Sequence, residues 1–534
     1  MPDAGEHAAP EVPGEGVVTV PTQGRPPVGG RFGPWRDRLA DSPRYRGWVL
    51  VASLLGLLSA GFSITVLAVS VPEIAADLDA PVSLMIWVVT GAIFAYAIFG
   101  PSAGKLADML GARRVWLVSL SAVTVFAALS AVAQTGATLV ALRVLGAAVG
   151  AAAGPSSLAM INRLYARHER ARALGYWSMV AAGGPVIGVV IGGPVVEAFS
   201  WRWIFVGQVP LTLLAVAVGW LVLPVVPRRV GVRFDVAGTV LLAAGSVSLL
   251  VALNRGPQLG WTSPAVLAGF ALCPVLLAGF VAVERRVASP LLPVRYLRDR
   301  NFAASVTNQF SLNFAYMGAF TITPLMLSGL LGWQASKIGY VSIARPLVFA
   351  IAGPIAGYLA VRVGERTNAV VGGVAIAISM LGLALVSTSS SDVLIVVALG
   401  LSGLGMGTAA PAMAASLANA VDEEDLGVAT AFQQMCMQIG VVVGAQIMLS
   451  VQQASSPIDG DVPTDPSTLS PAVLDALATS YHWAYLTGAA VAGLGIVAAL
   501  FVRSTRRDPV HDADRLLDEL EVLDAEMAPA SARP

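Results

Sequence analysis

The stretch 104–114 reads Gly-Lys-Leu-Ala-Asp-Met-Leu-Gly-Ala-Arg-Arg, and a related stretch, Gly-Tyr-Leu-Ala-Val-Arg-Val-Gly-Glu-Arg, occupies 357–366. Each follows a long apolar run, and Gly357 lies 253 positions after Gly104. A loop motif that recurs in this way indicates a chain made of two similar halves. Many membrane transporters are built from internal repeats, with the substrate site between the halves near mid-membrane.

The composition of the whole chain is that of an integral membrane protein. Of 534 residues, 56% are hydrophobic and 12% are charged, and the mean hydropathy is +0.73. A typical globular domain has roughly 25% charged residues. The formal net charge is +0, so no basic field favours nucleic acid. Cys273 and Cys436 lie in apolar runs, which offers neither a disulfide framework nor a CxxC metal site.

Fourteen apolar stretches are long enough to cross a bilayer, which takes about 20 residues in a helix. We predict spans at 47–72, 84–104, 114–134, 138–160, 173–196, 203–226, 236–253, 264–283, 303–329, 338–361, 368–387, 393–416, 427–450 and 482–502. Residues 1–46 are rich in Pro, Gly and charge and are predicted to form a disordered tail, and 503–534 form a second tail.

The distribution of basic residues predicts that both termini are cytoplasmic. Cytoplasmic loops carry an excess of Lys and Arg. With the N-terminus inside, the loops on the outer side contain no basic residues except Arg202, Arg255 and Lys337. The longest predicted outer loop, 451–481, contains acidic residues and no basic one.

If the spans at 236–253 and 264–283 are an insertion, the other twelve form two halves of six, 47–226 and 303–502, and 227–302 holds the inserted pair and a cytoplasmic linker. The chain then resembles the major facilitator superfamily, in particular its fourteen-span branch of drug:proton antiporters, over roughly 47–450. Besides the loop motif, the landmarks are Trp87 to Thr90, Arg143, Gly184-Pro185, Gly192-Gly193, Trp201 to Phe205, Phe234 to Gly238, Gly260-Trp261, and Glu284 with Pro290 to Leu292.

The resemblance implies an all-α membrane protein, with two six-helix halves, an inserted pair and 14 transmembrane helices. It implies a secondary transporter that exports amphipathic drugs or metabolites by alternating access, in exchange for protons. The excess of Arg over Lys, with much Ala, Val and Gly, indicates a GC-rich bacterial genome, so we expect a bacterial plasma membrane as its location. A monomer without cofactor or metal is expected, with substrate, lipid bilayer and protons as its partners. An uncoupled facilitator or uptake carrier of the same fold is the alternative. A membrane enzyme would need a catalytic motif, and the sequence offers none.

In the loop motif, we expect Gly104 to let helices two and three approach and Gly111 to turn the chain. Asp108 can lie against a helix N-terminus or an arginine, where a negative charge is favoured. The resemblance implies that Asp108 latches the two halves on the cytoplasmic side, and a solvated loop carboxylate is the alternative. Arg113 and Arg114 are either gating residues or anchors of the positive-inside face.

An acidic run at 422–425 precedes span thirteen on the same predicted side. It can cap that helix and pair with Arg113 and Arg114, or it can remain a solvated run of charges.

Span five carries a row of small residues that the resemblance identifies as a hinge of antiporters. Small residues on one face let helices pack closely, and a proline loosens a helix. The hinge candidates are Gly184, Pro185, Gly188, Gly192 and Gly193. Val189 stands where the family pattern has a proline, so close packing without a role in antiport is the alternative.

Arg143 in span four and Arg345 in span ten place charges within the membrane, which is costly unless they face a cavity or a partner. The resemblance links Arg143 to proton coupling or substrate contact. Arg345 precedes Pro346, and it either binds an anionic group of the substrate or donates to backbone that the proline frees.

Span one departs from the family pattern, because Ser63 stands where an acidic residue is expected. No Asp or Glu lies at the middle of a predicted span, and a titrating carboxylate is the usual proton carrier. The carboxylates at span edges, Glu197 and Asp235, are therefore the candidates for proton coupling, and Glu197 is nearer the presumed pathway.

Amides and hydroxyls are the other polar groups inside the predicted spans. Asn308, Gln309 and Tyr316 lie roughly on one face of span nine, and Gln434 and Gln438 lie in span thirteen. These side chains either contact the substrate or bridge helices.

Overall fold

The computed structural model describes residues 42, 44–85, 87–165, 169–224, 235–287, 295–422, 425–458 and 469–503. Both predicted tails fall almost wholly outside these residues. Within the helices, the side-chain surroundings of some residues also lie outside the description, including those of Ser63, 185–194 and Glu197.

Every regular element in the described residues is an α-helix. The N-terminal half comprises α2 (Tyr45–Asp77), α3 (Val82–Met85), α4 (Trp87–Leu110), α5 (Ala112–Ala131), α6 (Gly136–Gly150), α7 (Ala153–Leu164), α8 (Arg170–Ala198) and α9 (Arg202–Val222). The inserted pair is α10 (Val236–Leu259) and α11 (Pro264–Glu284), and the short α12 (Arg295–Arg298) follows it. The C-terminal half comprises α13 (Arg300–Leu331), α14 (Ala335–Ser342), α15 (Ala344–Val363), α16 (Glu365–Ala384), α17 (Asp392–Asn419), α18 (Leu426–Ala454) and α19 (Pro471–Leu500).

Each predicted span coincides with a helix or with two consecutive helices. In the described residues, 11 helical segments are long and apolar enough to cross a membrane. The pair Trp87–Tyr96 and Ile98–Leu110, which is bent by 41° within α4, adds a twelfth. The predicted spans 47–72 and 173–196 coincide with α2 and α8. The chain is therefore an all-helical, multi-pass membrane protein.

Three predicted spans differ in detail from the helices. A turn at Ala151 and Ala152 divides span four into α6 and α7, and a break at Ile343 divides span ten into α14 and α15. Helix α19 begins at Pro471 rather than at 482, and Ser470 caps it by accepting a hydrogen bond from the Val473 N–H. The predicted outer loop is therefore shorter than expected, because the first turns of α19 are too polar to be recognised by hydropathy.

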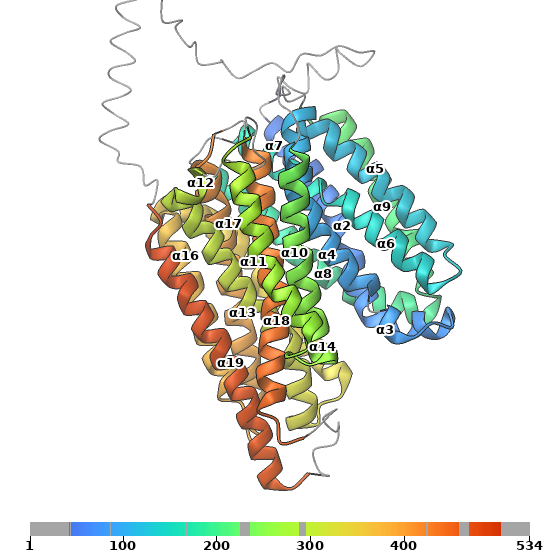
Figure 1. Cartoon of the computed structure of the whole chain (residues 1–534), viewed down its shortest axis with the longest axis vertical. Coiled ribbons are helices and arrows are strands. Elements are labelled where there is room, and N and C mark those ends of the chain that lie inside the picture. The colour runs from blue at the N-terminus through green and yellow to red at the C-terminus, as the bar shows by residue number, and fades with distance from the viewer. Residues whose placement is uncertain are drawn as a thin grey trace, which may run out of the picture.

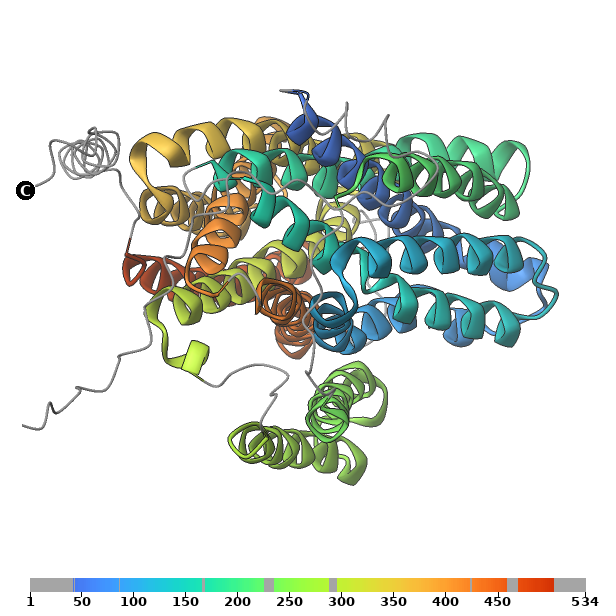
Figure 2. The ribbon, with the colours of Figure 1, turned by 90° about the horizontal axis from the view of Figure 1, so that it is seen from above.

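The inserted pair lies over one of the interfaces between the two halves (Figure 1). Helix α4 of the N-terminal half packs against α18 of the C-terminal half, and α8 packs against α15. Helix α10 contacts both α4 and α18, and Figure 2 shows the inserted pair in green beside the rest of the bundle. Arg255 of α10 lies over the Trp87 ring of α4, with its guanidinium carbon 5.9 Å from the ring centre.

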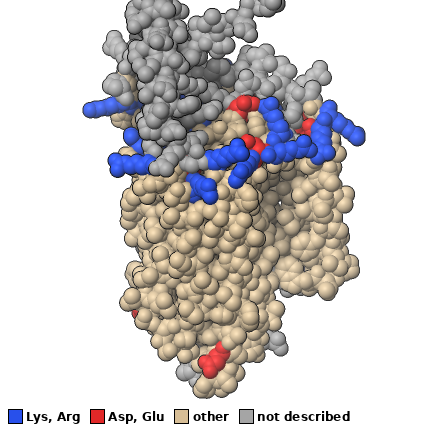
Figure 3. All heavy atoms as spheres, turned by 90° about the vertical axis from the view of Figure 1, so that its left-hand side faces the viewer, with Lys and Arg blue, Asp and Glu red and all other residues tan. Residues whose placement is uncertain are grey.

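The surface of the molecule suits a lipid bilayer. Large apolar side chains are exposed along the helices, including Val118, Val275 and Ile355. Lipid chains can cover such side chains without the unfavourable hydration of apolar surface. Lys and Arg side chains form a band near one end of the molecule, the end where α7 and α12 lie (Figures 1 and 3). We call this end the basic end.

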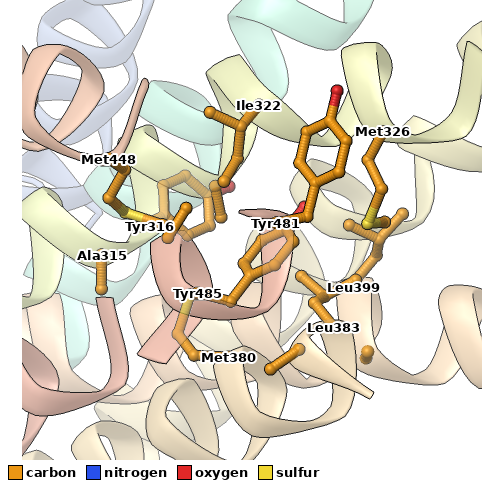
Figure 4. Close-up of a cluster of buried hydrophobic side chains, with 14 of the residues drawn as sticks. Ala315, Tyr316, Ile322, Met326, Met380, Leu383, Leu399, Met448, Tyr481 and Tyr485 are labelled. Atoms are coloured by element: carbon orange, nitrogen blue, oxygen red, sulfur yellow. The ribbon is translucent and has the colours of Figure 1, made fainter. Parts of the chain in front are cut away.

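The largest packed cluster of the C-terminal half joins α13, α16, α17, α18 and α19. Figure 4 shows Tyr316, Tyr481 and Tyr485 of this cluster among methionine and leucine side chains. The Tyr485 hydroxyl lies 2.9 Å from the Thr323 hydroxyl, whereas the Tyr481 hydroxyl has no hydrogen-bond partner among the described residues. Such dense packing allows the helices of this half to move as one body.

Candidate functional site

Asp108 joins the two halves by bonding the N-terminus of α18. Its Oδ1 accepts a hydrogen bond from the Gly427 N–H at 3.2 Å, and its Oδ2 accepts one from the Val428 N–H at 3.0 Å. Arg163 of α7 places its Nη2 3.4 Å from Asp108 Oδ1. The carboxylate is buried rather than solvated, with 6% of the residue exposed. A helix N-terminus carries a partial positive charge that stabilises an anion.

Gly104 faces α18 rather than α5, which corrects the expectation that it serves the approach of helices two and three. A Cβ atom at Gly104 would lie 2.5 Å from the Gly427 carbonyl oxygen and 2.6 Å from Ala431 Cβ. A glycine is therefore required for α4 to come close enough for Asp108 to reach the α18 backbone. Gly111 turns the chain between α4 and α5 with φ 94°, as predicted.

The second copy of the motif repeats this close packing between α15 and α8. A Cβ atom at Gly357 would lie 2.6 Å from the Ala171 carbonyl oxygen, and one at Gly175 would lie 2.5 Å from the Gly353 carbonyl oxygen. The two interfaces are therefore related by the internal repeat, and each depends on a glycine at the contact.

The repeat is not complete, because only the first copy carries an acidic residue at the position of Asp108. Gly364 adopts the same kind of turn as Gly111, with φ 87°. The position that corresponds to Asp108 is Val361 in the second copy. At the α8–α15 interface, Val361 therefore offers no carboxylate at the position of Asp108.

Arg170 is a second contact between the halves, which we did not predict as a site residue. Its Nη1 donates to the Ala418 carbonyl at 3.1 Å and to Asn419 Oδ1 at 2.9 Å, at the C-terminus of α17. Its Nε donates to the Asn162 carbonyl at 2.8 Å, and the residue is 3% exposed. In the sequence, Arg170 stands in a basic run typical of a cytoplasmic loop, and nothing there signals its burial.

The acidic run before α18 faces the linker of the inserted pair rather than the motif arginines. Asp422 forms an ion pair with Arg295 of α12 and accepts a hydrogen bond from the Tyr296 hydroxyl. Arg113 instead donates from Nη2 to the Trp220 carbonyl of α9 at 2.6 Å, and Arg114 is exposed. The expected pairing of this run with Arg113 and Arg114 is therefore wrong for the described residues.

Further contacts between the halves lie toward the same end of the bundle. The hydroxyls of Tyr176 and Tyr358 are 3.0 Å apart, on α8 and α15. The guanidinium carbon of Arg172 lies 5.0 Å from the centre of the Tyr358 ring. These contacts close the basic end of the bundle on the side opposite the inserted pair.

Gln434 lies at the contact between the halves, deeper in the bundle. Its Oε1 accepts a hydrogen bond from the Tyr96 hydroxyl of α4 at 3.2 Å, and its Nε2 is buried without a hydrogen-bond partner in the described residues. Gln438 follows one helical turn further along α18 and is half-buried. Both predicted residues lie on α18, further from its N-terminus than the residues that Asp108 contacts.

Asn308 and Gln309 of α13 bridge to different helices, and Asn313 donates to the Gln309 side chain. Asn308 donates from Nδ2 to the Gly495 carbonyl of α19 at 2.9 Å. Gln309 donates from Nε2 to the Ala410 carbonyl of α17 at 3.1 Å. Because their amides face different helices, the bridging alternative accounts for both.

The two arginines within spans stand in different halves and lie against aromatic rings. The guanidinium carbon of Arg143 is 5.7 Å from the Phe205 ring centre. Arg345 is 2% exposed and donates from Nη1 to the Tyr316 carbonyl of α13 at 3.2 Å, so its acceptor is not backbone freed by Pro346. The Nε and Nη2 of Arg345 are buried without a hydrogen-bond partner in the described residues.

Helix α8 runs without interruption through the predicted hinge at 184–193. A Cβ atom at Gly184 would have its nearest contact at 3.7 Å, from Leu58 Cδ1, which is an ordinary packing distance. The surroundings of Pro185, Gly188, Gly192 and Gly193 lie outside the described residues. The close contact of α8 with the other half occurs nearer its start, at Gly175.

The candidates for proton coupling lie at helix ends. Asp235 caps α10, where its Oδ1 accepts a hydrogen bond from the Gly238 N–H at 2.8 Å, and it belongs to the inserted pair. Glu197 lies at the far end of α8, and Ser63 lies within α2, with their side chains outside the description. The other buried carboxylates of the described residues also lie near helix ends, namely Asp108, Glu284, Glu365 and Asp425.

Two pseudo-symmetric helical halves, joined at one end by charges placed on helix termini, define a membrane transporter. The chain belongs to the Major Facilitator Superfamily, whose family model matches residues 53–445 and 308–529.

Three curated relatives have names that refer to drug transport or resistance. The chain is 28% identical over 402 residues to the multidrug transporter protein MdtP of Bacillus subtilis, covering 75% of this chain and 74% of that protein. It is 28% identical over 411 residues to the tetracenomycin C resistance and export protein of Streptomyces glaucescens, covering 77% and 76%. It is 31% identical over 339 residues to the puromycin resistance protein pur8 of Streptomyces alboniger, covering 63% and 67%.

Solved structures show the same fold at low sequence identity. The proton:xylose symporter XylE matches with a TM-score of 0.60 and 15% identity, covering 86% of this chain and 97% of that one. The human organic anion transporter MFSD10 also matches with a TM-score of 0.60 and 15% identity, covering 86% and 100%.

Proposed function

We propose that this protein exports amphipathic small molecules across a bacterial plasma membrane by alternating access between its two halves, in exchange for protons. The family and the relatives named for drug transport support export. The observation that carries the proposal is the contact of Asp108 with the N-terminus of α18. It joins the halves at one end of the bundle, and it has to break before that end can open.

The proposed topology has fourteen spans, with both termini in the cytoplasm and the basic end facing it. The units are the half at 47–226, the inserted pair and linker at 227–302, and the half at 303–502. The band of Lys and Arg in Figure 3 supports this orientation, because basic residues are retained on the cytoplasmic side. The contacts of Asp108, Arg170 and Tyr176 then close the cytoplasmic end in the described conformer.

The energy of the Asp108 contact is of the right size for a gate. A carboxylate at a helix N-terminus contributes about 0.3–1 kcal/mol when exposed and up to ~2 kcal/mol when partly buried. Two conformations of a protein that are both populated differ by only a few kcal/mol. One such contact can therefore shift the balance between the two access states without making the closed state permanent.

Proton exchange requires a group that titrates while it faces each side in turn. Arg143 cannot serve, since a guanidinium stays protonated in proteins. Asp235 caps a helix of the inserted pair and belongs to neither half. We assign the role to Glu197, at the outer end of α8, the helix that meets the other half at Gly175.

The test is flux of a fluorescent amphipathic dye in proteoliposomes with imposed pH gradients. Wild-type flux should follow the gradient, Glu197→Gln should abolish that response, and Asp235→Asn should retain it. A response that survives in both variants would show that another group carries the proton.

The competing function is an uncoupled facilitator of the same fold. The observation that favours it is Ser63, which stands where the family pattern has an acidic residue. Wild-type dye flux that is insensitive to every imposed gradient would establish this function in place of antiport.

A further inference from the structure

The linker that follows the inserted pair reaches the loop between α17 and α18. Tyr296, in α12, places its hydroxyl 2.9 Å from Asp422 Oδ2 and 3.0 Å from Asp425 Oδ2. The same hydroxyl accepts hydrogen bonds from the Asp422 N–H at 3.3 Å and from Arg295 Nη2 at 3.1 Å. Arg295 also forms an ion pair with Asp422. One tyrosine therefore meets both acidic residues that are described in this loop.

Tyr296 is held firmly in its place. It is 5% exposed, and its ring stacks on Phe302 with 6.0 Å between ring centres. Phe302 in turn stacks on Phe432 of α18 at 6.1 Å. Burial raises the pKa of Tyr296 to about 12, so the hydroxyl keeps its proton at physiological pH and can donate it to a carboxylate.

The residues that Tyr296 contacts are directly connected to the gate. Asp425 immediately precedes Leu426, the first residue of α18. The next two residues, Gly427 and Val428, donate the N–H groups that Asp108 accepts. Tyr296 and Asp108 thus bind the same helix end, one from the linker and the other from the N-terminal half.

The inserted pair and the start of α18 also share one apolar cluster. This cluster contains residues of α10, α11, α12, α13, α17 and α18, among them Leu242, Phe280, Tyr296 and Leu426. Helix α10 of the pair reaches across to α4 as well. The start of α18 is therefore fixed to the inserted pair by apolar packing as well as by hydrogen bonds.

We propose that Tyr296 is a positioning residue for the cytoplasmic gate, through which the inserted pair and its linker hold the N-terminus of α18 in place for Asp108. The proposal rests on the alternating-access function proposed above. Without the Tyr296 hydroxyl, Asp422 and Asp425 lose the hydrogen-bond partner that they share, so the start of α18 is held less firmly and its two N–H groups are aimed less accurately at the carboxylate. The closed state of the basic end is then less populated, although the described contacts of Tyr296 do not include Asp108.

The first test measures gate closure without reference to any substrate. Spin labels at Leu110→Cys and Arg366→Cys, both exposed near the basic end, report the distance between the halves in a background without Cys273 and Cys436. Tyr296→Phe should lower the ratio of closed to open populations by about tenfold, as expected for a lost hydrogen bond to a charged group. The matched control is Tyr481→Phe, which removes an unpaired hydroxyl from a buried tyrosine of α19.

The second test separates positioning from a general loss of stability. In an Asp108→Asn background the gate contact is already weakened, so Tyr296→Phe should have little further effect on the distance distribution. Equal effects of Tyr296→Phe in the wild-type and Asp108→Asn backgrounds would refute the proposal. A Tyr296→Phe variant whose closed population equals that of the wild type would refute it too. Failure of the proposed transport function gives a different result from failure of the Tyr296 proposal. In that case the wild-type protein shows no dye flux, whatever the distance between its spin labels.

Discussion

Asp108 and Arg170 bind opposite ends of the same interhelical loop. The Asp108 carboxylate accepts hydrogen bonds at the N-terminus of α18, and the Arg170 guanidinium donates to acceptors at the C-terminus of α17. Each charge has the sign that its helix end favours. Both residues belong to the N-terminal half, and the loop belongs to the C-terminal half, so the closed end is held by two complementary charges.

Replacing Asp108 by Asn should strongly reduce transport while the protein still inserts and folds. Asparagine keeps the size but loses the charge that favours the α18 N-terminus, and its amide would face Arg163. The ratio of closed to open states should fall by about 3- to 30-fold. Dye flux in proteoliposomes measures transport, and elution in size-exclusion chromatography measures whether the variant folds. Wild-type flux in this variant would make Asp108 irrelevant to gating.

Replacing Arg170 by Gln should weaken closure of the basic end by at least about tenfold, since charge-assisted hydrogen bonds to two helices are lost. The control is Arg286→Gln, which removes an exposed arginine at the end of α11. The distance between spin labels in the two halves is the measurement. Equal spin-label distances in the Arg170→Gln and Arg286→Gln variants would show that Arg170 does not hold the basic end closed.

Replacing Gly104 by Ala should prevent close contact of α4 and α18, because the new methyl group would meet the Gly427 carbonyl oxygen at 2.5 Å. The control is Gly207→Ala in α9, where a Cβ atom meets nothing within 4 Å. The control should be neutral or slightly stabilising, as expected for alanine in a helix. The two variants are compared by their thermal unfolding and by the accessibility of the basic end to a thiol reagent. If the basic end of the Gly104→Ala variant is as inaccessible as that of the control, the α4–α18 interface does not depend on this glycine.

Replacing Arg345 by Met should raise thermal stability and lower transport. A buried guanidinium with two unpaired nitrogens costs free energy that an apolar side chain of similar length does not. The gain should be about 1–4 kcal/mol if the site resembles other buried charges that have been replaced. Melting temperature and dye flux are measured on the same preparation. A lower melting temperature would show that the charge is compensated within the folded protein.

The proposed orientation can be checked by labelling of single cysteines in intact cells. Ser455→Cys, in the loop between α18 and α19, should react with an impermeant thiol reagent. Arg172→Cys, near the start of α8, should react only after the cells are opened. The reverse pattern would place both termini outside.

The span positions and the turn at Gly111 could be predicted because both depend on local sequence. A helix that crosses a bilayer needs about 20 apolar residues, and a positive φ favours glycine. The α18 contact of Gly104, and the roles of Arg170 and Tyr296, depend on distant parts of the chain. Arg170 and Ala418 are 248 positions apart, and Tyr296 and Asp422 are 126 apart. Only the packing of the two halves brings these residues together.

The α8–α15 and α4–α18 interfaces at the basic end are held by different contacts, and this difference implies a side from which substrate can approach. Packing of α8 on α15 depends on glycines, a pair of tyrosine hydroxyls and the Arg172 guanidinium over the Tyr358 ring, and these short-range contacts are lost after a small separation. The α4–α18 interface has the Asp108 carboxylate, and α10 lies against both of its helices. We therefore expect the halves to part first between α8 and α15. An amphipathic molecule dissolved in the inner leaflet would then move sideways from the lipid into the protein through this gap, without first passing into the cytoplasm.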